Sequence, residues 1–325
     1  MSQDLGLPVR AVEETLLGAE RTLTRTQVAD RAGVPLELAE QLWQQLGFPH
    51  AADDDVAFSQ VDVVALGLTH DLLGFGVLTP DSQAALVRTW GRSFARLAEW
   101  QVGLIARLAV EDADPATRLT ELTDTVLPDV ERLQAYVWRR HLAGAAARLL
   151  EGGTGTTAPS AVGFVDIVGY TAQSRDLTDR ELVDWVELFE SHLTSSVVET
   201  GGRVIKTIGD EVLFATDDAA AAVEIALTAT ERGADPEDPF PPVRAGVAYG
   251  EVVGRLGDVL GPTVNLASRL TSVARPGTVL VERGAHDALL APGDDDAAVV
   301  LRRLPRTSVR GYSRLEAWAA RRAPH

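Results

Sequence analysis

Hydrophobic residues recur at helical spacing through the first 150 residues, in long segments rich in Leu and Ala. This periodicity predicts helices, and strand-like alternation is nearly absent there. Within residues 81–110 the apolar positions form one stripe, which predicts a helix facing the core or a dimer partner, with the core as the preferred interpretation. The stripe consists of Leu86, Trp90, Phe94, Leu97, Leu104, Ile105 and Leu108. The predicted breaks between helices lie near Gly33, Pro49, Pro80, Pro115 and Pro128.

The pattern changes after a predicted helix that spans roughly 129–150. Residues 151–158 are rich in Gly and Thr and predict a flexible linker. We therefore predict a helical regulatory or dimerisation domain over 1–150 and a second domain over 159–322, in which strand and helix signals alternate. Two domains of this size are expected for a chain of 325 residues.

The predicted order of elements in the second domain is β-α-β-β-α-β, as in a ferredoxin-like sheet with helices on one face. The predicted fold class is therefore α+β. Predicted strands are the apolar run at 161–167, two segments around Gly209-Asp210, a hairpin turning near Tyr249-Gly250, and regions near Val279 and over 299–318. Predicted helices are 179–202 with its glycine stop, about 217–232, and the segment opened by Gly261 and Pro262.

The composition narrows the possible functions. The chain contains no cysteine, which excludes disulfides, thiolate metal sites and cysteine nucleophiles. Its formal charge of −17 disfavours binding to nucleic acid, because such binding depends largely on cationic side chains. The sequence has no basic leader followed by an apolar stretch and no apolar run of about 18 residues, so we expect a soluble cytoplasmic protein without a membrane span.

Two acidic residues stand at the ends of predicted strands. Asp166 lies in the apolar run 164–167, and Asp210 lies between the two strands around Gly209. A carboxylate in a buried strand is costly unless a cation compensates it. Because the first strand of a ferredoxin-like sheet lies beside the central hairpin, the two carboxylates are expected to hold two Mg²⁺ or Mn²⁺ ions. The alternative is that Asp166 forms an internal salt bridge and Asp210 serves only the turn.

From 161 to about 319 the sequence resembles the class III nucleotide cyclases, of the bacterial adenylate cyclase type with an N-terminal regulatory domain. Four segments carry the resemblance, in the family's order and with its intervals: FVDIVGYT, GGRVIKTIGDEVLFAT, VRAGVAYGEVV and GDVLGPTVNLASRL. The resemblance implies that Asp166 and Asp210 bind two metal ions, with help from the main-chain carbonyl of Ile167. It also implies four further site residues. These are Lys206 and Asp258, which would recognise adenine, and Asn265 and Arg269, which would stabilise the transition state.

The implied reaction converts ATP to 3′,5′-cyclic AMP and pyrophosphate, at two sites shared between the chains of a homodimer. One metal ion would activate the ribose 3′-hydroxyl and the other would neutralise the triphosphate. Arg269 offers a fork of donors to the α-phosphate, and Asn265 lies one helical turn away. Lys206 can donate to a ring nitrogen of adenine and Asp258 can accept from its amine. Lys206 is the only lysine among 30 Lys and Arg residues, which we interpret as the need for a compact donor at the purine edge.

The first domain is less informative. Residues 26–66 resemble a MerR-type winged helix-turn-helix in spacing, with Gly33 at the turn, but the net charge of −5 over 24–66 disfavours DNA binding. We predict instead a regulatory domain that changes how two cyclase domains align, through the helix that ends at Leu150. A proton acting on His70 or His141, or an apolar ligand among the helices, is the alternative to a purely structural role for these residues.

Three other functions compete with catalysis. An interaction module that keeps the fold only for dimerisation predicts loss of at least one of the six functional side chains, and none is lost. A DNA-binding regulator predicts a basic patch, which the sequence lacks. A diguanylate cyclase predicts a Gly-Gly-Asp/Glu-Glu-Phe motif, whereas Ile-Gly-Asp-Glu-Val stands at 208–212.

Overall fold

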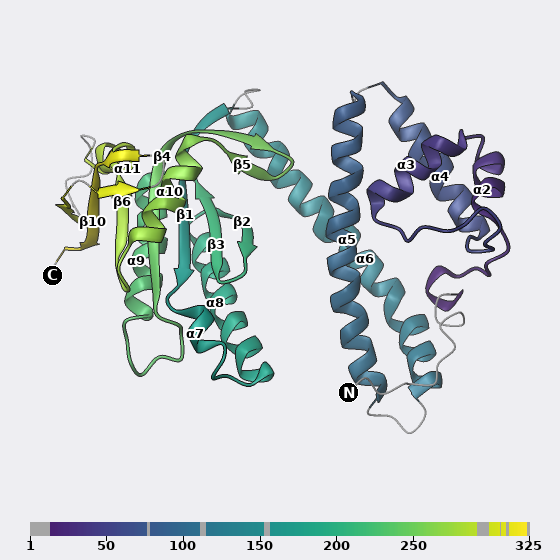
Figure 1. Ribbon diagram of the computed structural model, residues 1–325, viewed down its shortest axis with the longest axis horizontal. Helices are drawn as coiled ribbons and strands as arrows, with labels where there is room; N and C mark the ends of the chain where they lie inside the picture. Colours follow the sequence, from purple (N-terminus) through teal and green to yellow (C-terminus); the bar gives the residue numbers. More distant parts are fainter. Residues whose placement is uncertain are drawn as a thin grey trace. The chain divides into compact units, whose positions relative to one another are not determined.

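The computed structural model describes residues 14–76, 79–110, 115–152, 157–290, 299–305, 307–309 and 312–323. The chain divides into two compact units, 1–148 and 149–325, and each contains its own buried apolar clusters (Figure 1). In the ranges just given, no helix combines the length and the hydropathy that a bilayer span requires.

The described part of the first unit is helical, as predicted. Its helices are α2 (Arg25–Ala32), α3 (Leu36–Leu46), α4 (Gln60–Gly74), α5 (Pro80–Val110) and α6 (Pro115–Gly152), the last of which continues into the second unit. Helix α2 begins at a capping box, in which Thr24 and Gln27 each accept a hydrogen bond from the other's backbone N–H. It ends at Gly33, whose φ of 67° favours glycine.

A short backbone pairing closes this part of the first unit. Leu23, which precedes α2, forms an isolated antiparallel bridge with Phe58, which precedes α4. The pair α2–α3 and this bridge agree with the spacing of a winged helix-turn-helix. They do not identify that motif, which stays a prediction.

Two predictions about the long helices are wrong. Pro128 lies inside α6 and not at a break, although a proline removes one backbone hydrogen bond from a helix interior. Trp90 and Phe94, expected in the core, are 39% and 57% exposed, and α5 buries Ala85 and Val87 instead. Helical periodicity reports an apolar face but not whether a neighbour covers it. Of the other stripe residues, Leu86 and Leu97 are partly buried, and the side chains of Leu104, Ile105 and Leu108 lie outside the described set.

The second unit is built on a mixed sheet with the strand order β2-β3-β1-β4-β6-β10-β7, and β5 pairs with β4. Its first four members, in the order β2-β3-β1-β4, match the predicted βαββαβ arrangement. Strands β8 and β9 form a separate pair. The strands are β1 (Thr157–Ile167), β2 (Arg203–Ile208), β3 (Glu211–Thr216), β4 (Val243–Arg255), β5 (Asp258–Leu260), β6 (Val279–Glu282), β7 (Val299–Arg303), β8 (Thr307–Val309), β9 (Tyr312–Leu315) and β10 (Ala317–Arg322).

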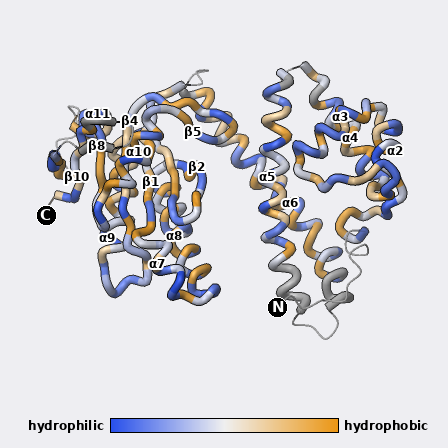
Figure 2. The backbone as a smooth tube through the Cα atoms, viewed as in Figure 1, coloured by the Kyte–Doolittle hydropathy of each residue, from blue (hydrophilic) through white to orange (hydrophobic). Residues whose placement is uncertain are grey.

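Both faces of this sheet are covered by helices. The helices are α7 (Tyr170–Gln173), α8 (Asp179–Glu199), α9 (Ala219–Arg232), α10 (Pro262–Val273) and α11 (Arg283–Leu289). Because neighbouring residues of a strand point to opposite faces, Val165 packs in the cluster of α8 and α9, whereas Phe164 packs with Ala267 of α10. Figure 2 shows the resulting concentration of hydrophobic residues along the central strands. The prediction of helices on one face only is therefore wrong for α10.

The predicted hairpin at Tyr249-Gly250 is also wrong. Strand β4 runs straight through these residues, and the chain turns at Leu256 and Gly257, where φ is 54° and 82°. Gly250 serves a close approach instead, since a Cβ there would lie 3.0 Å from the hydroxyl oxygen of Thr263 in α10. Helix α11 was not predicted.

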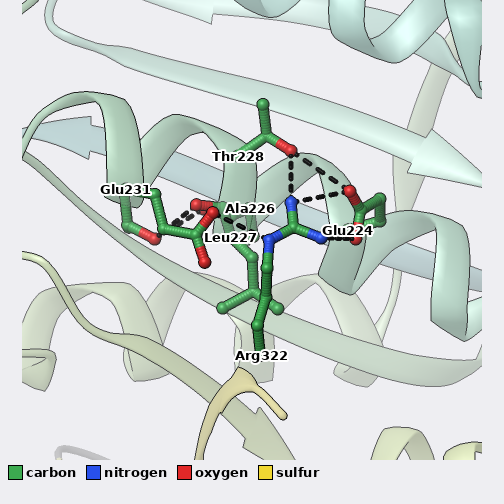
Figure 3. A network of polar contacts seen from close by, with 7 residues as sticks. Glu224, Ala226, Leu227, Thr228, Glu231 and Arg322 are labelled. Carbon is green, nitrogen blue, oxygen red and sulfur yellow. Dashed lines mark hydrogen bonds and ion pairs between the residues drawn. The ribbon is translucent and has the colours of Figure 1, made fainter. Parts of the chain in front are cut away.

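An ion-pair network attaches the last strand to α9 (Figure 3). Arg322 of β10 donates two hydrogen bonds of 2.7 Å to the carboxylate of Glu224 and one of 2.8 Å to Glu231. Such a two-point contact between guanidinium and carboxylate is stronger than a single ion pair. It holds the C-terminal strand against the helix layer.

Candidate active site

Three charged residues form a row across the sheet at the end of β1. Asp166 of β1 lies directly opposite Glu211 of β3 on one side and Arg244 of β4 on the other. Cross-strand partners project from the same face of a sheet. Arg244 donates to Asp166 Oδ2 through Nε and Nη2, both at 2.7 Å, and the Asp166 side chain is only 14% exposed.

Asp210 lies beside this row in the turn between β2 and β3. Its main-chain carbonyl accepts a hydrogen bond of 3.0 Å from the backbone N–H of Ile167, the last residue of β1. Gly209, which precedes it, has a φ of 65° that allows the tight turn. The fold therefore brings Asp166, Ile167 and Asp210 together, as the predicted strand order requires.

The electrostatics of this corner favour a bound cation. Burial raises the pKa of the Asp166 carboxyl, Arg244 opposes the rise, and the nearby Asp210 adds to it. Burial, Asp166 and Asp210 together raise the pKa of Glu211 to about 7. One guanidinium thus faces three carboxyl groups, and a divalent cation would offset the excess negative charge.

The two carboxylates and the main-chain carbonyl are oxygen donors of the kind that Mg²⁺ and Mn²⁺ bind. Among the residues that the structure describes, no three acidic, His or Cys side chains surround a common point. Mg²⁺ is usually held by one or two carboxylates together with substrate phosphates and water. Asp166 and Asp210 can supply those carboxylates. Ile167, whose main-chain carbonyl is the third candidate ligand, directly follows Asp166 in the sequence.

Lys206 and Asp258 form a second group. Lys206 lies on β2 and Asp258 begins β5, and Lys206 Nζ is 2.6 Å from Asp258 Oδ2. Both side chains are accessible, at 42% and 35% exposed. The other carboxylate oxygen of Asp258 accepts from the backbone N–H of Val259, which orients the group. A donor and an acceptor therefore stand side by side on an accessible surface.

Asn265 and Arg269 form a third group on α10. They are four residues apart and both are exposed, whereas Ala267 and Leu270 of the same helix are buried against the sheet. Within the described ranges, no hydrogen bond or ion pair of a single chain joins this group to Asp166, Asp210 or the Lys206–Asp258 pair. The strand register also separates two of the three pairs, because Asp166 lies opposite Arg244 near the start of β4, whereas Asp258 lies opposite Arg255 at its end.

Sequence reasoning missed Glu211 and Arg244. Glu211 follows Asp210 directly, and Arg244 is a charged residue at the start of the apolar strand VRAGVA. Their importance appears only in the strand register, which places both beside Asp166. A charged residue within an apolar strand was the available signal for Arg244, as it was for Asp166.

The sequence is similar to known nucleotide cyclases. The family model for the adenylate and guanylate cyclase catalytic domain matches residues 155–320. An adenylate cyclase of Glutamicibacter nicotianae is 36% identical, over 95% of this chain and 81% of that protein. An adenylate cyclase of Streptomyces coelicolor is 40% identical, over 88% of this chain and 77% of that protein.

One solved structure is more distantly similar to about half of this chain. It is the catalytic core of a rhodopsin-guanylyl cyclase with converted specificity, in complex with ATPαS. The two sequences are 21% identical, and the match covers 51% of this chain and 98% of that one with a TM-score of 0.46.

Proposed function

The chain belongs to the adenylate and guanylate cyclase family, and we propose that it converts ATP to 3′,5′-cyclic AMP and pyrophosphate. Besides family membership, the Lys206–Asp258 pair is the observation that supports ATP over GTP as the substrate. Lys206 offers only donors, which suits a ring nitrogen of adenine. Asp258 offers only acceptors when ionised, which suits the exocyclic amine. Guanine presents the reverse pattern at that edge.

Asp166 and Asp210 would hold two Mg²⁺ or Mn²⁺ ions, with the carbonyl of Ile167 as a further ligand. When bound, these ions would activate the ribose 3′-hydroxyl and neutralise the triphosphate. The raised pKa of Asp166 and the excess of carboxyl groups around it support this assignment. Arg244 compensates Asp166 in the structure.

Asn265 and Arg269 would act on the reacting phosphate. Arg269 can present two parallel N–H donors to the α-phosphoryl oxygens as negative charge develops there. Asn265, one turn earlier on the same helix face, can orient the ribose or the phosphate. Their exposure on α10 is consistent with contact to a substrate.

The separation of these groups supports a homodimer with two shared sites. Because the pairs stand apart in one chain, a site that needs all six side chains would take the metal-binding aspartates from one chain and the other four residues from its partner. A two-fold axis would then generate two equivalent sites.

The first unit would control the alignment of the two catalytic units. Helix α6 runs to Gly152, and β1, which carries Asp166, begins at Thr157. The exposed apolar residues of α6 support a role for this helix in an interface, since large apolar side chains are seldom left in water as a group. They include Leu133, Tyr136 and Trp138, at 60%, 59% and 60% exposed.

The direct test supplies ATP and GTP separately to the purified full chain with Mn²⁺ and measures both cyclic nucleotides. We expect cyclic AMP from ATP and little product from GTP. Lys206→Glu should abolish the production of cyclic AMP, whereas Arg321→Glu, an equal charge reversal at an exposed position of β10, should not. Equal use of the two nucleotides, or full activity of Lys206→Glu, would contradict the proposal.

A further inference from the structure

A second candidate binding site lies in the first unit, away from the residues discussed above. A cavity of about 300 Å³ opens between α3, the loop that follows it and the start of α2. This volume is at the lower end of the range for small-molecule sites. The lining residues are Arg25, Glu40, Trp43, Gln44, Phe48, Pro49, His50, Ala51 and Phe58.

Three of the nine lining residues are large aromatics, Trp43, Phe48 and Phe58. Trp43 stacks on Phe58 with ring centroids 4.8 Å apart and an interplanar angle of 30°, and the backbone of Phe58 is held by the bridge to Leu23. The indole is therefore fixed by packing on one side. Phe48, which also lines the cavity, is 54% exposed, so much of its ring is accessible to a ligand.

The charge around the cavity is negative. Arg25 lies between two carboxylates: its Nη1 is 2.8 Å from Glu40, and it also forms an ion pair with Asp53. Glu40 and Arg25 line the cavity and balance each other, and Asp53, which pairs with Arg25 but is not a lining residue, adds a second negative charge beside it. The whole of 24–66 carries a net charge of −5. The Arg25 guanidinium is already paired with Glu40 and Asp53, so it is not free to bind an anionic ligand in this cavity. Such a ligand would also be repelled by the two carboxylates.

We propose that this cavity binds a small organic cation of the quaternary ammonium class. Aromatic faces attract such cations through their π electrons, and the excess carboxylate charge adds to the attraction. The side-chain amide of Gln44 can accept or donate a hydrogen bond to a short polar tail. The site is independent of the proposed catalysis, since none of its residues belongs to the second unit.

Ligand-observed NMR on the full chain tests the proposal with two probes of the same shape. Choline carries the positive charge, and 3,3-dimethylbutan-1-ol is its neutral counterpart. We expect saturation transfer to the methyl groups of choline, and an affinity at least about fivefold higher than that of the neutral probe. Equal binding of the two probes, or no binding of choline at millimolar concentration, would overturn the proposal.

Substitutions of cavity residues test whether choline binds in this cavity. Phe48→Leu removes an exposed ring and should lower the affinity for choline about two- to fivefold. Glu40→Gln should lower it as well, because it removes the excess negative charge. Phe75→Leu, at a position 75% exposed in the same unit but outside the cavity, is the matched control and should bind choline like the unchanged chain. Unchanged binding by both cavity variants, with circular dichroism showing that they are folded, would place choline elsewhere and overturn the assignment.

Discussion

At the residue scale, Arg269 is expected to act on the transition state more than on ATP binding. Arg269→Ala should lower kcat by about 10² to 10³, with a much smaller change in KM, because the lost donors serve charge that appears only during the reaction. Arg269→Lys keeps the charge but loses the fork, and should recover only part of the rate. Steady-state kinetics with ATP and Mn²⁺ measures both parameters.

Arg275→Ala is the control for this change, since it removes the same charge from an exposed residue just after α10. It should leave both kinetic parameters nearly unchanged. A similar loss in both variants, or a loss confined to KM, would argue against the role given to Arg269.

His192 makes the stability of the catalytic unit depend on pH. Its Nε2 is buried without a hydrogen-bond partner, its ring meets the edge of Phe240 at 4.9 Å, and burial followed by the charge of Arg232 lowers its pKa below 6.5. The nearby Asp238 and Glu199 only partly oppose this. The unfolded chain therefore binds a proton near pH 6.5 that the folded chain rejects, and stability should fall as the pH drops through 6.5.

Urea unfolding at pH 7.5 and 5.5 measures this effect. His192→Phe removes the titrating group, so the difference in unfolding free energy between the two pH values should shrink. The same substitution at the exposed His141 should leave the difference as it is. An unchanged difference in His192→Phe would exclude this histidine as a source of the pH dependence.

The predicted juxtaposition of Asp166 and Asp210 is confirmed, since the backbone next to Asp166 bonds the Asp210 carbonyl. The signal for Asp166 was a carboxylate in an apolar strand, and the predicted strand order placed Asp210 beside it. That the two carboxylates bind metal stays a prediction. The strand register determines which residues lie opposite Asp166, and it cannot be deduced from the sequence of one strand alone. For this reason the partners Glu211 and Arg244 were missed.

At the scale of elements, the crossing of α3 and α5 depends on Gly91. A Cβ at this position would lie 2.4 Å from the carbonyl oxygen of Leu46. This oxygen belongs to the backbone at the end of α3, which cannot easily move away. Gly91→Ala should therefore destabilise the first unit by about 1 to 3 kcal/mol, as overpacking does elsewhere. Thermal unfolding followed by circular dichroism measures the change.

Gly103→Ala on the same helix is the matched control. A Cβ there meets nothing within 4 Å, so the better helix propensity of Ala should stabilise by up to about 1 kcal/mol. Equal effects of the two substitutions would mean that the crossing does not constrain α5.

Helix α6 should transmit its rotation to the catalytic unit. Two residues inserted after Gly144 turn the following segment by about 200°, whereas seven residues restore the original face to within about 20°. We expect the two-residue insertion to change cyclic AMP production strongly and the seven-residue insertion to change it much less. Indistinguishable activities for the two insertions would argue against control through the orientation of α6.

The two glycines used to predict turns in the second unit had different outcomes. Gly250 suggested a hairpin, but it lies within β4 and allows the approach of Thr263. Gly209 was interpreted correctly as a turn, and its positive φ confirms that conformation. A glycine marks a place where a Cβ does not fit or a special φ is needed, and the sequence does not say which of the two applies.

At the scale of the whole molecule, the apolar periodicity of the first unit correctly predicted helices, but the preferred assignment of the 81–110 stripe to the core was wrong for Trp90 and Phe94. Trp90 and Phe94 belong to a real stripe on α5, yet they are exposed in one chain. Whether such a stripe faces a core, a second chain or a ligand depends on what packs against it, and no single sequence contains that information. The same limit applies to the three separated pairs of candidate site residues.

The most direct measurement mixes two inactive variants, Asp166→Ala and Asn265→Ala, and assays the production of cyclic AMP. If each site takes its aspartates from one chain and Asn265 from the other, every mixed dimer has one intact site. With free exchange of chains, half of the dimers are mixed, so the mixture should recover about a quarter of the unmodified activity. A mixture that stays inactive, although mass spectrometry shows that mixed dimers have formed, would contradict the shared sites.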